Sequence, residues 1–322
     1  MADPLQILDA HLHARRIRAR RLKDGVASLV VDATGLSDLE QRAMEEELRS
    51  TVGVIEGVES VRVAFTAEKV ERTLIAVGSG KGGVGKSTLS ANLAIALSSL
   101  GRKVGMIDAD IYGPSQPTIF GAHDKPQARE NLLVPVEAHG IRLLSVGQMV
   151  SADTALAWRG PMATSALNQL IDADWGDADT LVIDLPPGTG DVQLSLIKKA
   201  RPAAAVIVST PQDLSLIDAR RAVDLFAKTG VPVLGIIENM AGYACPHCGE
   251  TSDPFGQGGA EASAKSMDIP FLGRLPLSAS LRAASDEGHP AALDEGPARD
   301  AFVDLAGKIL DRVEAVRSQS GR

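Results

Sequence analysis

The chain is poor in aromatic residues and in cysteine. Aromatics make up 3% of its 322 residues, so its core must be built mainly from aliphatic side chains. Two cysteines, Cys245 and Cys248, allow one disulfide at most, which excludes a small secreted scaffold held by several disulfides. Hydrophobic residues nevertheless reach 44%, which predicts a globular protein with a full core.

Long apolar runs and an excess of positive charge are also missing. Apolar stretches such as residues 203–208 are far too short to span a bilayer, and the N-terminus has no signal-peptide pattern. The formal net charge is -8, and an acidic chain is repelled by nucleic acid and by anionic membranes. We therefore expect neither as a partner, and we predict a cytoplasmic protein with reduced thiols.

Residues 74–322 alternate short aliphatic runs with helical stretches. Each run is apolar almost throughout, as in strands that are buried on both faces of a parallel sheet. This alternation predicts an α/β domain with a doubly wound, mostly parallel sheet. The predicted strands are residues 74–78, 104–108, 141–145, 180–184, 204–209 and 233–238. Helices are expected at 89–100 and 216–228.

Residues 1–70 form a different pattern, with strands expected at 26–32 and 61–65 and an acidic amphipathic helix at 38–52. This predicts a small α+β domain, joined through a polar linker at 68–72. The basic run at 15–23 could be a nucleic-acid arm, but a solvated helix or strand face is the more common reason for such a run.

The segment at residues 80–88, GKGGVGKST, matches the phosphate-binding loop G-x-x-x-x-G-K-[ST] between a strand and a helix. Its glycines let backbone amides turn toward phosphate, and the helix N-terminus adds positive potential. Lys86 would bind the β- and γ-phosphates of ATP, and the Ser87 hydroxyl would bind magnesium. The predicted nucleotide-binding residues of the loop are Gly80, Lys81, Gly82, Gly83, Val84, Gly85, Lys86, Ser87 and Thr88.

Lys81 is a second lysine in this loop. KGGVGKS resembles the deviant Walker A loops of the MinD, ParA and nitrogenase-iron-protein class. The resemblance implies a homodimer in which Lys81 reaches the nucleotide of the partner subunit, although a lysine here could also be a solvated loop charge.

Aspartates follow two of the predicted strands. Ligands of open α/β sheets bind beyond the carboxyl ends of the strands, so Asp184 is expected to hold magnesium there, through water. Asp108 and Asp110 lie at the end of a neighbouring strand; we assign Asp108 to the magnesium shell and Asp110 to the attacking water. A single aspartate at such a place is more often a turn or cap residue.

The cysteine pair lies in ACPHCG, residues 244–249. A thioredoxin-like redox motif should open a helix early in the fold, whereas this loop comes late. A zinc site within one chain lacks ligands, because His247 is too close to both cysteines to be an easy third one. Two copies of Cys245 and Cys248 would provide four thiolates, which suit zinc or an iron–sulfur cluster equally. Two ordinary thiols are the remaining alternative.

Taken together, the motifs resemble the Mrp/ApbC-type iron–sulfur cluster carrier family. The matching stretches are GSGKGGVGKST (78–88), DADIYGPSQP (108–117), WRGPM (158–162), VIDLPPGTGD (182–191), STPQDLSLIDARRA (209–222) and IENMAGYACPHCGE (237–250). The resemblance implies a homodimer that holds a labile [4Fe–4S] cluster between two copies of Cys245 and Cys248. It also implies slow ATP hydrolysis coupled to transfer of the cluster from donors to apo-protein clients, and it makes Asn239 the residue that contacts adenine.

The N-terminal domain resembles the MIP18-like domain of such carriers. VDATGLSDLEQRA (31–43) has Leu36 where that domain usually has a cysteine, so we expect scaffolding or docking there rather than thiol chemistry.

Two other functions share the phosphate loop. A MinD- or ParA-type spatial-organisation ATPase would need a basic membrane helix or a DNA-binding surface. The C-terminal stretch 299–322 instead mixes charges of both signs opposite its apolar face, as in a helix packed on its own domain. A zinc-stapled dimeric regulatory ATPase keeps every motif and differs only in the metal.

Overall fold

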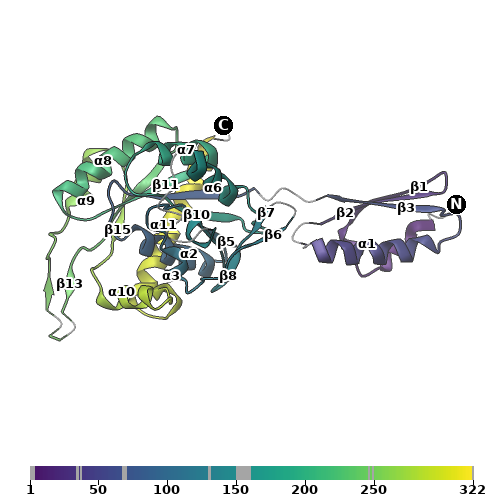
Figure 1. The fold of residues 1–322 in the computed structure, drawn as a ribbon, viewed down its shortest axis with the longest axis horizontal. Helices are drawn as coiled ribbons and strands as arrows, with labels where there is room; N and C mark the ends of the chain where they lie inside the picture. The colour runs from purple at the N-terminus through teal and green to yellow at the C-terminus, as the bar shows by residue number, and fades with distance from the viewer. Residues whose placement is uncertain are drawn as a thin grey trace. The chain divides into compact units, whose positions relative to one another are not determined.

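The polypeptide divides into two units, Met1–Glu71 and Arg72–Arg322, in a computed structural model (Figure 1). The structure describes residues 4–33, 36, 38–66, 71–129, 132–149, 161–245, 247–248 and 250–320. Residues 68–70 of the predicted linker lie outside these ranges, as do residues 158–160 of the WRGPM stretch.

The N-terminal unit is a three-stranded sheet with a helix packed against it. The central strand β2 (Val26–Asp32) runs antiparallel to β1 (Ile17–Lys23) and parallel to β3 (Ser60–Thr66). The connection from β2 to β3 contains α1 (Asp38–Gly53), and Leu29 and Leu48 are among the residues that fill the space between sheet and helix. Two short 3-10 helices, η1 (Pro4–Ala10) and η2 (Ala14–Arg16), precede β1. The predicted strands and helix of this region are confirmed, whereas the MIP18-like resemblance stays a prediction.

Two features of this unit bear on its predicted role. Most of the basic run lies in the edge strand β1, and its Arg18 and Lys23 side chains are largely exposed. Leu36 is partly buried against the small core, while the neighbouring Thr34, Gly35 and Ser37 are outside the described residues. Burial gives Leu36 a packing role, in line with the absence of a thiol at this point.

The C-terminal unit is built on an eight-stranded sheet whose order is β15-β12-β11-β4-β10-β5-β9-β8. All neighbours pair in parallel except the edge strand β8, which is antiparallel to β9. The strands are β4 (Thr73–Gly78), β5 (Val104–Asp108), β8 (Val136–Ala138), β9 (Ile141–Ser145), β10 (Thr180–Asp184), β11 (Ala204–Ser209), β12 (Val233–Glu238) and β15 (Phe271–Arg274). The doubly wound parallel sheet that we predicted is therefore confirmed.

Helices cover both faces of this sheet and bury separate aliphatic clusters against it. One face packs against α2 (Lys86–Ser99), α3 (Gln116–Ile119), α10 (Ala279–Asp286) and α11 (Pro297–Ser320). The other packs against α6 (Pro161–Ile171), α7 (Asp191–Ala200), α8 (Asp213–Lys228) and α9 (Gly259–Ser266). Shorter elements are β6 (Gln127–Arg129), β7 (Leu132–Val134), α4 (Val146–Met149), β13 (Tyr243–Ala244), β14 (Thr251–Ser252) and η3 (Ala291–Leu293).

The six predicted strands are all present, and only the first differs, by beginning at Thr73. Sequence reasoning missed β15 and β8. β15 has only four residues, of which Leu272 alone is buried, and β8 is a three-residue antiparallel edge strand. Neither has the continuous apolar run that marks a central parallel strand.

The C-terminal helix α11 packs on its own unit, as we predicted. Phe302, Leu305, Ile309 and Val313 are buried in the cluster that also contains α2. Among the described residues, no helix combines the length and hydropathy needed to cross a membrane.

Candidate functional site

The phosphate loop connects the central strand β4 to α2, which begins at Lys86. Gly83 and Gly85 have φ angles of 78° and 81°, in the left-handed region that glycine adopts without strain. Lys81, Gly82, Gly83, Gly85, Lys86, Ser87 and Thr88 line a pocket of about 800 Å³. The loop thus places the positive end of α2 at the pocket, which suits a phosphate group.

Two glycines of the loop lie against other elements with no room for a side chain. A Cβ atom at Gly80 would lie 2.0 Å from the backbone of Asp218 in α8. One at Gly85 would lie 2.2 Å from the Nδ2 atom of Asn239, which follows β12. The phosphate-loop motif accounts for these glycines by the need for a phosphate group to approach the backbone. Packing against α8 and Asn239 is a second reason for glycine at both positions.

Gly80→Ala is expected to lower the free energy of unfolding by about 2 kcal/mol, because the added methyl group must displace the α8 backbone. Gly82→Ala is the matched control, since within the described part of the chain its Cβ would meet Pro187 alone, at 3.9 Å. Urea unfolding without nucleotide measures both. Equal losses in the two variants would contradict the packing argument.

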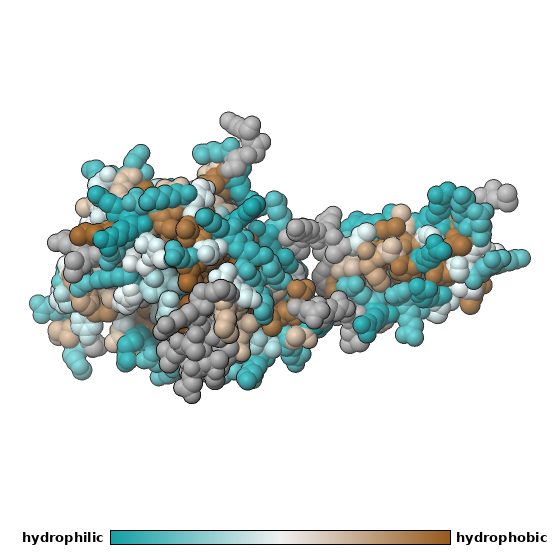
Figure 2. All heavy atoms as spheres, turned by 45° about the horizontal axis from the view of Figure 1, so that its top comes forward, coloured by the Kyte–Doolittle hydropathy of each residue, from teal (hydrophilic) through white to brown (hydrophobic). Residues whose placement is uncertain are grey.

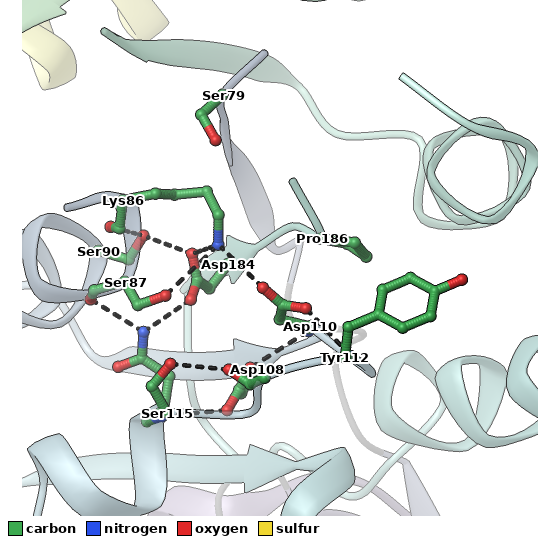
Figure 3. A network of polar contacts seen from close by, with 12 residues as sticks. Ser79, Lys86, Ser87, Ser90, Asp108, Asp110, Tyr112, Ser115, Asp184 and Pro186 are labelled. Carbon is green, nitrogen blue, oxygen red and sulfur yellow. Dashed lines mark hydrogen bonds and ion pairs between the residues drawn. The ribbon is translucent and has the colours of Figure 1, made fainter. Parts of the chain in front are cut away.

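Lys86 is held in an ion pair behind the loop. Its Nζ atom donates to Asp184 Oδ1 at 2.5 Å and lies 3.9 Å from Asp110 Oδ2. Asp184 is fully buried, and its Oδ1 atom also accepts from Ser90 Oγ at 3.0 Å. Figure 3 shows the Lys86 side chain reaching across to both carboxylates. An ion pair of this kind, closed by further hydrogen bonds, fixes the positions of the Lys86 and Asp184 side chains.

Gln116, the first residue of α3, joins the three parts of the site. Its Nε2 atom donates to Asp184 Oδ2 at 2.9 Å and to the Ser87 carbonyl at 3.0 Å. Its backbone amide donates to Asp108 Oδ2 at 3.0 Å. From the sequence, Gln116 is part of the stretch DADIYGPSQP but has no predicted role, because no spacing rule links a glutamine to a carboxylate 68 positions away.

Asp108 lies beneath the pocket rather than in its lining. The register of the parallel pair places it beside Asp184, and it accepts further hydrogen bonds from Ser145 Oγ and from the Asp110 amide. Burial, together with the negative charge of Asp184, raises the pKa of Asp108 to about 7. Its contacts make Asp108 a support for the loop that follows β5.

Of the three aspartates predicted from the strand ends, Asp110 is the one that lines the pocket. Burial raises its pKa above the ordinary value, and Lys86 opposes that shift. Its Oδ1 atom accepts from the Tyr112 amide at 3.2 Å, while the Tyr112 ring points away from the carboxylates (Figure 3).

Asp108→Asn is expected to change how stability depends on pH. The folded pKa of about 7 lies above the ordinary value of 3.8, so the native state keeps a proton that the unfolded chain releases. Stability contributed by this proton is present at low pH and is lost as the pH rises from about 4 to 7. Asparagine does not ionise, so the variant should gain at least about 1 kcal/mol over wild type across that window. Urea unfolding at several pH values, without magnesium, measures the gain; parallel pH profiles would contradict it.

The far wall of the pocket comes from two segments, and of these a motif indicated only the first, which contains Asn239. Asn239, Met240 and Tyr243 line it beside the phosphate loop. The second segment leads into α10 and continues along it, with the lining residues Pro276, Leu277, Ser278, Ala279, Leu281, Arg282, Ser285 and Asp286. Asn239 Nδ2 donates to the Val84 carbonyl at 2.8 Å, so this predicted nucleotide contact also braces the loop.

The two cysteines lie in a hairpin whose short strands are β13 and β14. Cys245 is partly exposed and Cys248 exposed, and both are free thiols. The backbone amides of Cys248 and His247 donate to the Cys245 sulfur and lower the pKa of its thiol, which favours the metal-binding thiolate. Pro246 and Gly249 are outside the described residues. Within the part of the chain that the structure describes, no three metal-ligating side chains converge.

Comparison with known proteins agrees with this site. A carrier protein for iron–sulfur clusters from Pseudomonas fragi is 49% identical over 226 residues, or 69% of this chain and 79% of that protein. A mitochondrial iron–sulfur protein required for NADH dehydrogenase, from Arabidopsis thaliana, is 44% identical over 251 residues, or 76% of this chain and 80% of that protein.

A solved structure is similar as well. The nucleotide-binding protein of Archaeoglobus fulgidus, in complex with ADP and with cobalt, has a TM-score of 0.61 and 39% identity, covering 69% of this chain and 89% of that one. The family model described as NUBPL iron-transfer P-loop NTPase matches residues 70–310. That match spans nearly all of the unit that holds the phosphate loop and the cysteine hairpin, so the chain belongs to the family of NUBPL iron-transfer P-loop NTPases.

Proposed function

We propose that this protein binds and hydrolyses ATP, and that it carries a labile [4Fe–4S] cluster from a donor to apo-protein clients. One observation carries the proposal: Tyr243 lines the pocket of the phosphate loop and lies two residues before Cys245. A nucleotide pocket and a thiol pair thus share one structural element. Relatives of this chain are named iron–sulfur cluster carrier proteins, which supports an iron–sulfur cluster as the cargo.

In the proposed reaction, the loop amides and Lys86 bind the phosphates, so Lys86 must share its ammonium group between phosphate and Asp184. Asp110 lines the pocket and has a raised pKa, which suits it to orient the attacking water. Asp184 and Asp108 keep Lys86 and the loop of Asp110 in place. We expect slow hydrolysis, because Lys86 must weaken its bond to Asp184 before it can bind the phosphates.

Magnesium suits the donor set. Ser87 lines the pocket, and the Asp108 and Asp184 carboxylates lie behind it. The buried Oε1 atom of Gln116 has no hydrogen-bond partner among the residues that the structure describes. These are all oxygen donors, and magnesium keeps several waters rather than needing an all-protein cage. When bound, magnesium would neutralise charge that develops on the phosphates. Ser87 would bind it directly, and Asp184 and Asp108 through water.

A homodimer supplies what one chain lacks at the cysteines. Each copy offers two thiols, and a cluster held by cysteine needs four. Exposed apolar side chains close to the phosphate loop support a protein contact there: Tyr112 is 73% exposed and Ile217 55% exposed. Ile217 precedes Asp218, which contacts Gly80. Clusters of this kind need thiols that stay reduced, which fits the predicted cytoplasmic location.

Lys81→Ala tests the role of the second lysine. We expect ATP hydrolysis to fall at least about tenfold, because Lys81 would serve the nucleotide of the partner subunit. ADP binding to one subunit should change by less than about twofold, since Lys86 provides the cation in cis. Turnover assays and fluorescence titration measure the two. Loss of ADP binding in parallel with hydrolysis would show that Lys81 acts within its own subunit.

The function itself is tested by anaerobic reconstitution with iron and sulfide, followed by iron, sulfide and zinc analysis and by sedimentation. About four iron and four sulfide per dimer would support the carrier. Zinc alone, without visible absorbance after reconstitution, would replace it with the zinc-stapled regulatory ATPase. A monomer that binds neither metal would overturn both.

A further inference from the structure

Glu238 closes the segment that carries the cysteines. The chain leaves β12 at Glu238, forms the cysteine hairpin, and returns at the start of α9. The Glu238 carboxylate accepts from the Gly258 amide at 3.0 Å and from the Ala260 amide at 2.7 Å. Residues 239–258 are therefore a loop whose two ends meet at one side chain.

This contact is a buried ionic clamp. Glu238 is fully buried, and a buried carboxylate costs several kcal/mol unless its partners compensate. The Arg274 Nε atom donates to it at 2.9 Å, and this bond raises the pKa of Arg274. Arg274 also pairs with Glu261 and lies over the Phe271 ring, 5.2 Å from its centre. The amides at the start of α9 complete the set, since their partial positive charge favours an anion.

The clamp adjoins the nucleotide pocket. Asn239, the next residue, donates to the Val84 carbonyl and lies against Gly85 of the phosphate loop. Met240 has a φ angle of 60°, a backbone conformation that methionine rarely adopts. Tyr243 lines the pocket, pairs with Ser252 across the hairpin and bridges to Leu277. A ligand that fills the pocket would therefore meet the near end of the cysteine segment.

We propose that Glu238 is a positioning residue that couples the nucleotide pocket to the cysteine hairpin, by holding the far end of the hairpin segment against its near end. A ligand can shift a distant group only if it interacts differently with two arrangements of the chain. With both ends clamped, a shift at Asn239 and Tyr243 must move the hairpin as one piece. With the clamp broken, residues 239–258 can change conformation locally, so that a shift at Asn239 and Tyr243 no longer moves the thiols. This inference rests on the proposed function for the use of the thiols.

Thiol labelling tests the coupling without any cluster. Cys245 and Cys248 are the two cysteines of the chain, so alkylation of the full, reduced protein by iodoacetamide reports on this hairpin alone. In wild type, saturating ADP with magnesium is expected to change the alkylation rate about fivefold or more. In Glu238→Gln, one acceptor oxygen becomes an NH₂ group that cannot accept from an amide, and the change should fall below about 1.5-fold.

Glu261→Gln is the matched control. It removes the negative charge of the other, half-exposed partner of Arg274 but leaves Glu238 in place, and it should keep the wild-type response. Saturation is verified for each variant by fluorescence titration with a labelled ADP, and folding by thermal unfolding. If Glu238→Gln does not fold, Arg274→Gln takes its place. The Arg274 side chain is 35% exposed, and its replacement removes only one of the three groups that donate to Glu238.

Two results would overturn the inference: a wild-type rate that ADP leaves unchanged, or a clamp variant that responds as wild type does. Neither depends on the cluster. If reconstitution with iron failed, the proposed carrier function would be wrong, but the alkylation rates of the thiols would still test the coupling. Loss of the response in the clamp variant alone would establish Glu238 as the coupling residue.

Discussion

Asp184→Ala is expected to reduce ATP hydrolysis by more than about 100-fold and to lower the free energy of unfolding by about 3 kcal/mol. The two effects have one cause. The buried Asp184 carboxylate accepts from Lys86, Ser90 and Gln116. Its removal leaves the buried ammonium group with two more distant neighbours, Ser87 Oγ at 3.5 Å and the Asp110 carboxylate at 3.9 Å. Turnover assays and urea unfolding measure the losses.

Asp184→Asn separates the two effects, because it keeps the shape of the side chain and one acceptor oxygen. It should lose hydrolysis nearly as fully as the alanine variant while retaining more of the stability. An alanine variant with more than about a tenth of wild-type turnover would mean that Asp184 has only a structural role.

Cys245→Ala is expected to remove the reconstituted cluster, so that iron and sulfide fall from about four each per dimer to background. Cys245 is the thiol whose pKa is lowered by the amides of Cys248 and His247, and its loss leaves a dimer with two thiolates instead of four. The variant should fold normally, because Cys245 is partly exposed and fills no core space.

His247→Ala is the control for this loop. His247 is exposed and lies between the cysteines without being needed as a ligand, so iron and sulfide should stay at the wild-type level. Equal loss of iron in both variants would point to damage of the hairpin rather than loss of a ligand. Iron retained in Cys245→Ala would place the cluster elsewhere.

Much of the C-terminal unit could be read from the sequence because local patterns agree with the tertiary fold. Central parallel strands such as Val104–Asp108 and Thr180–Asp184 are buried on both faces, so they appear as continuous apolar runs. The phosphate loop is equally local, since its glycines, lysine and serine act within a few residues of one another. Their meeting with Asp108 and Asp184 also followed from strand ends that share one edge of a sheet.

The remaining features depend on contacts between residues far apart in the chain. Gln116 reaches Asp184 across 68 positions, and Asn239 reaches Val84 across 155. No periodicity or spacing encodes such pairs, because they arise only when strand order and register bring loops together. The different positions of Asp108 and Asp110 also depend on the tertiary structure. Asp108 is fully buried beneath the pocket, whereas Asp110 lines it.

By itself, therefore, the sequence determined the parallel sheet, the phosphate loop and the pair of thiols, all of which are set by neighbours in the chain. Only the tertiary structure decided that Gly80 must have no side chain, that α10 closes the pocket and that Glu238 joins the two ends of the cysteine segment. The physical reason is packing: excluded volume and buried hydrogen bonds exist only between surfaces that the folded chain has already brought into contact.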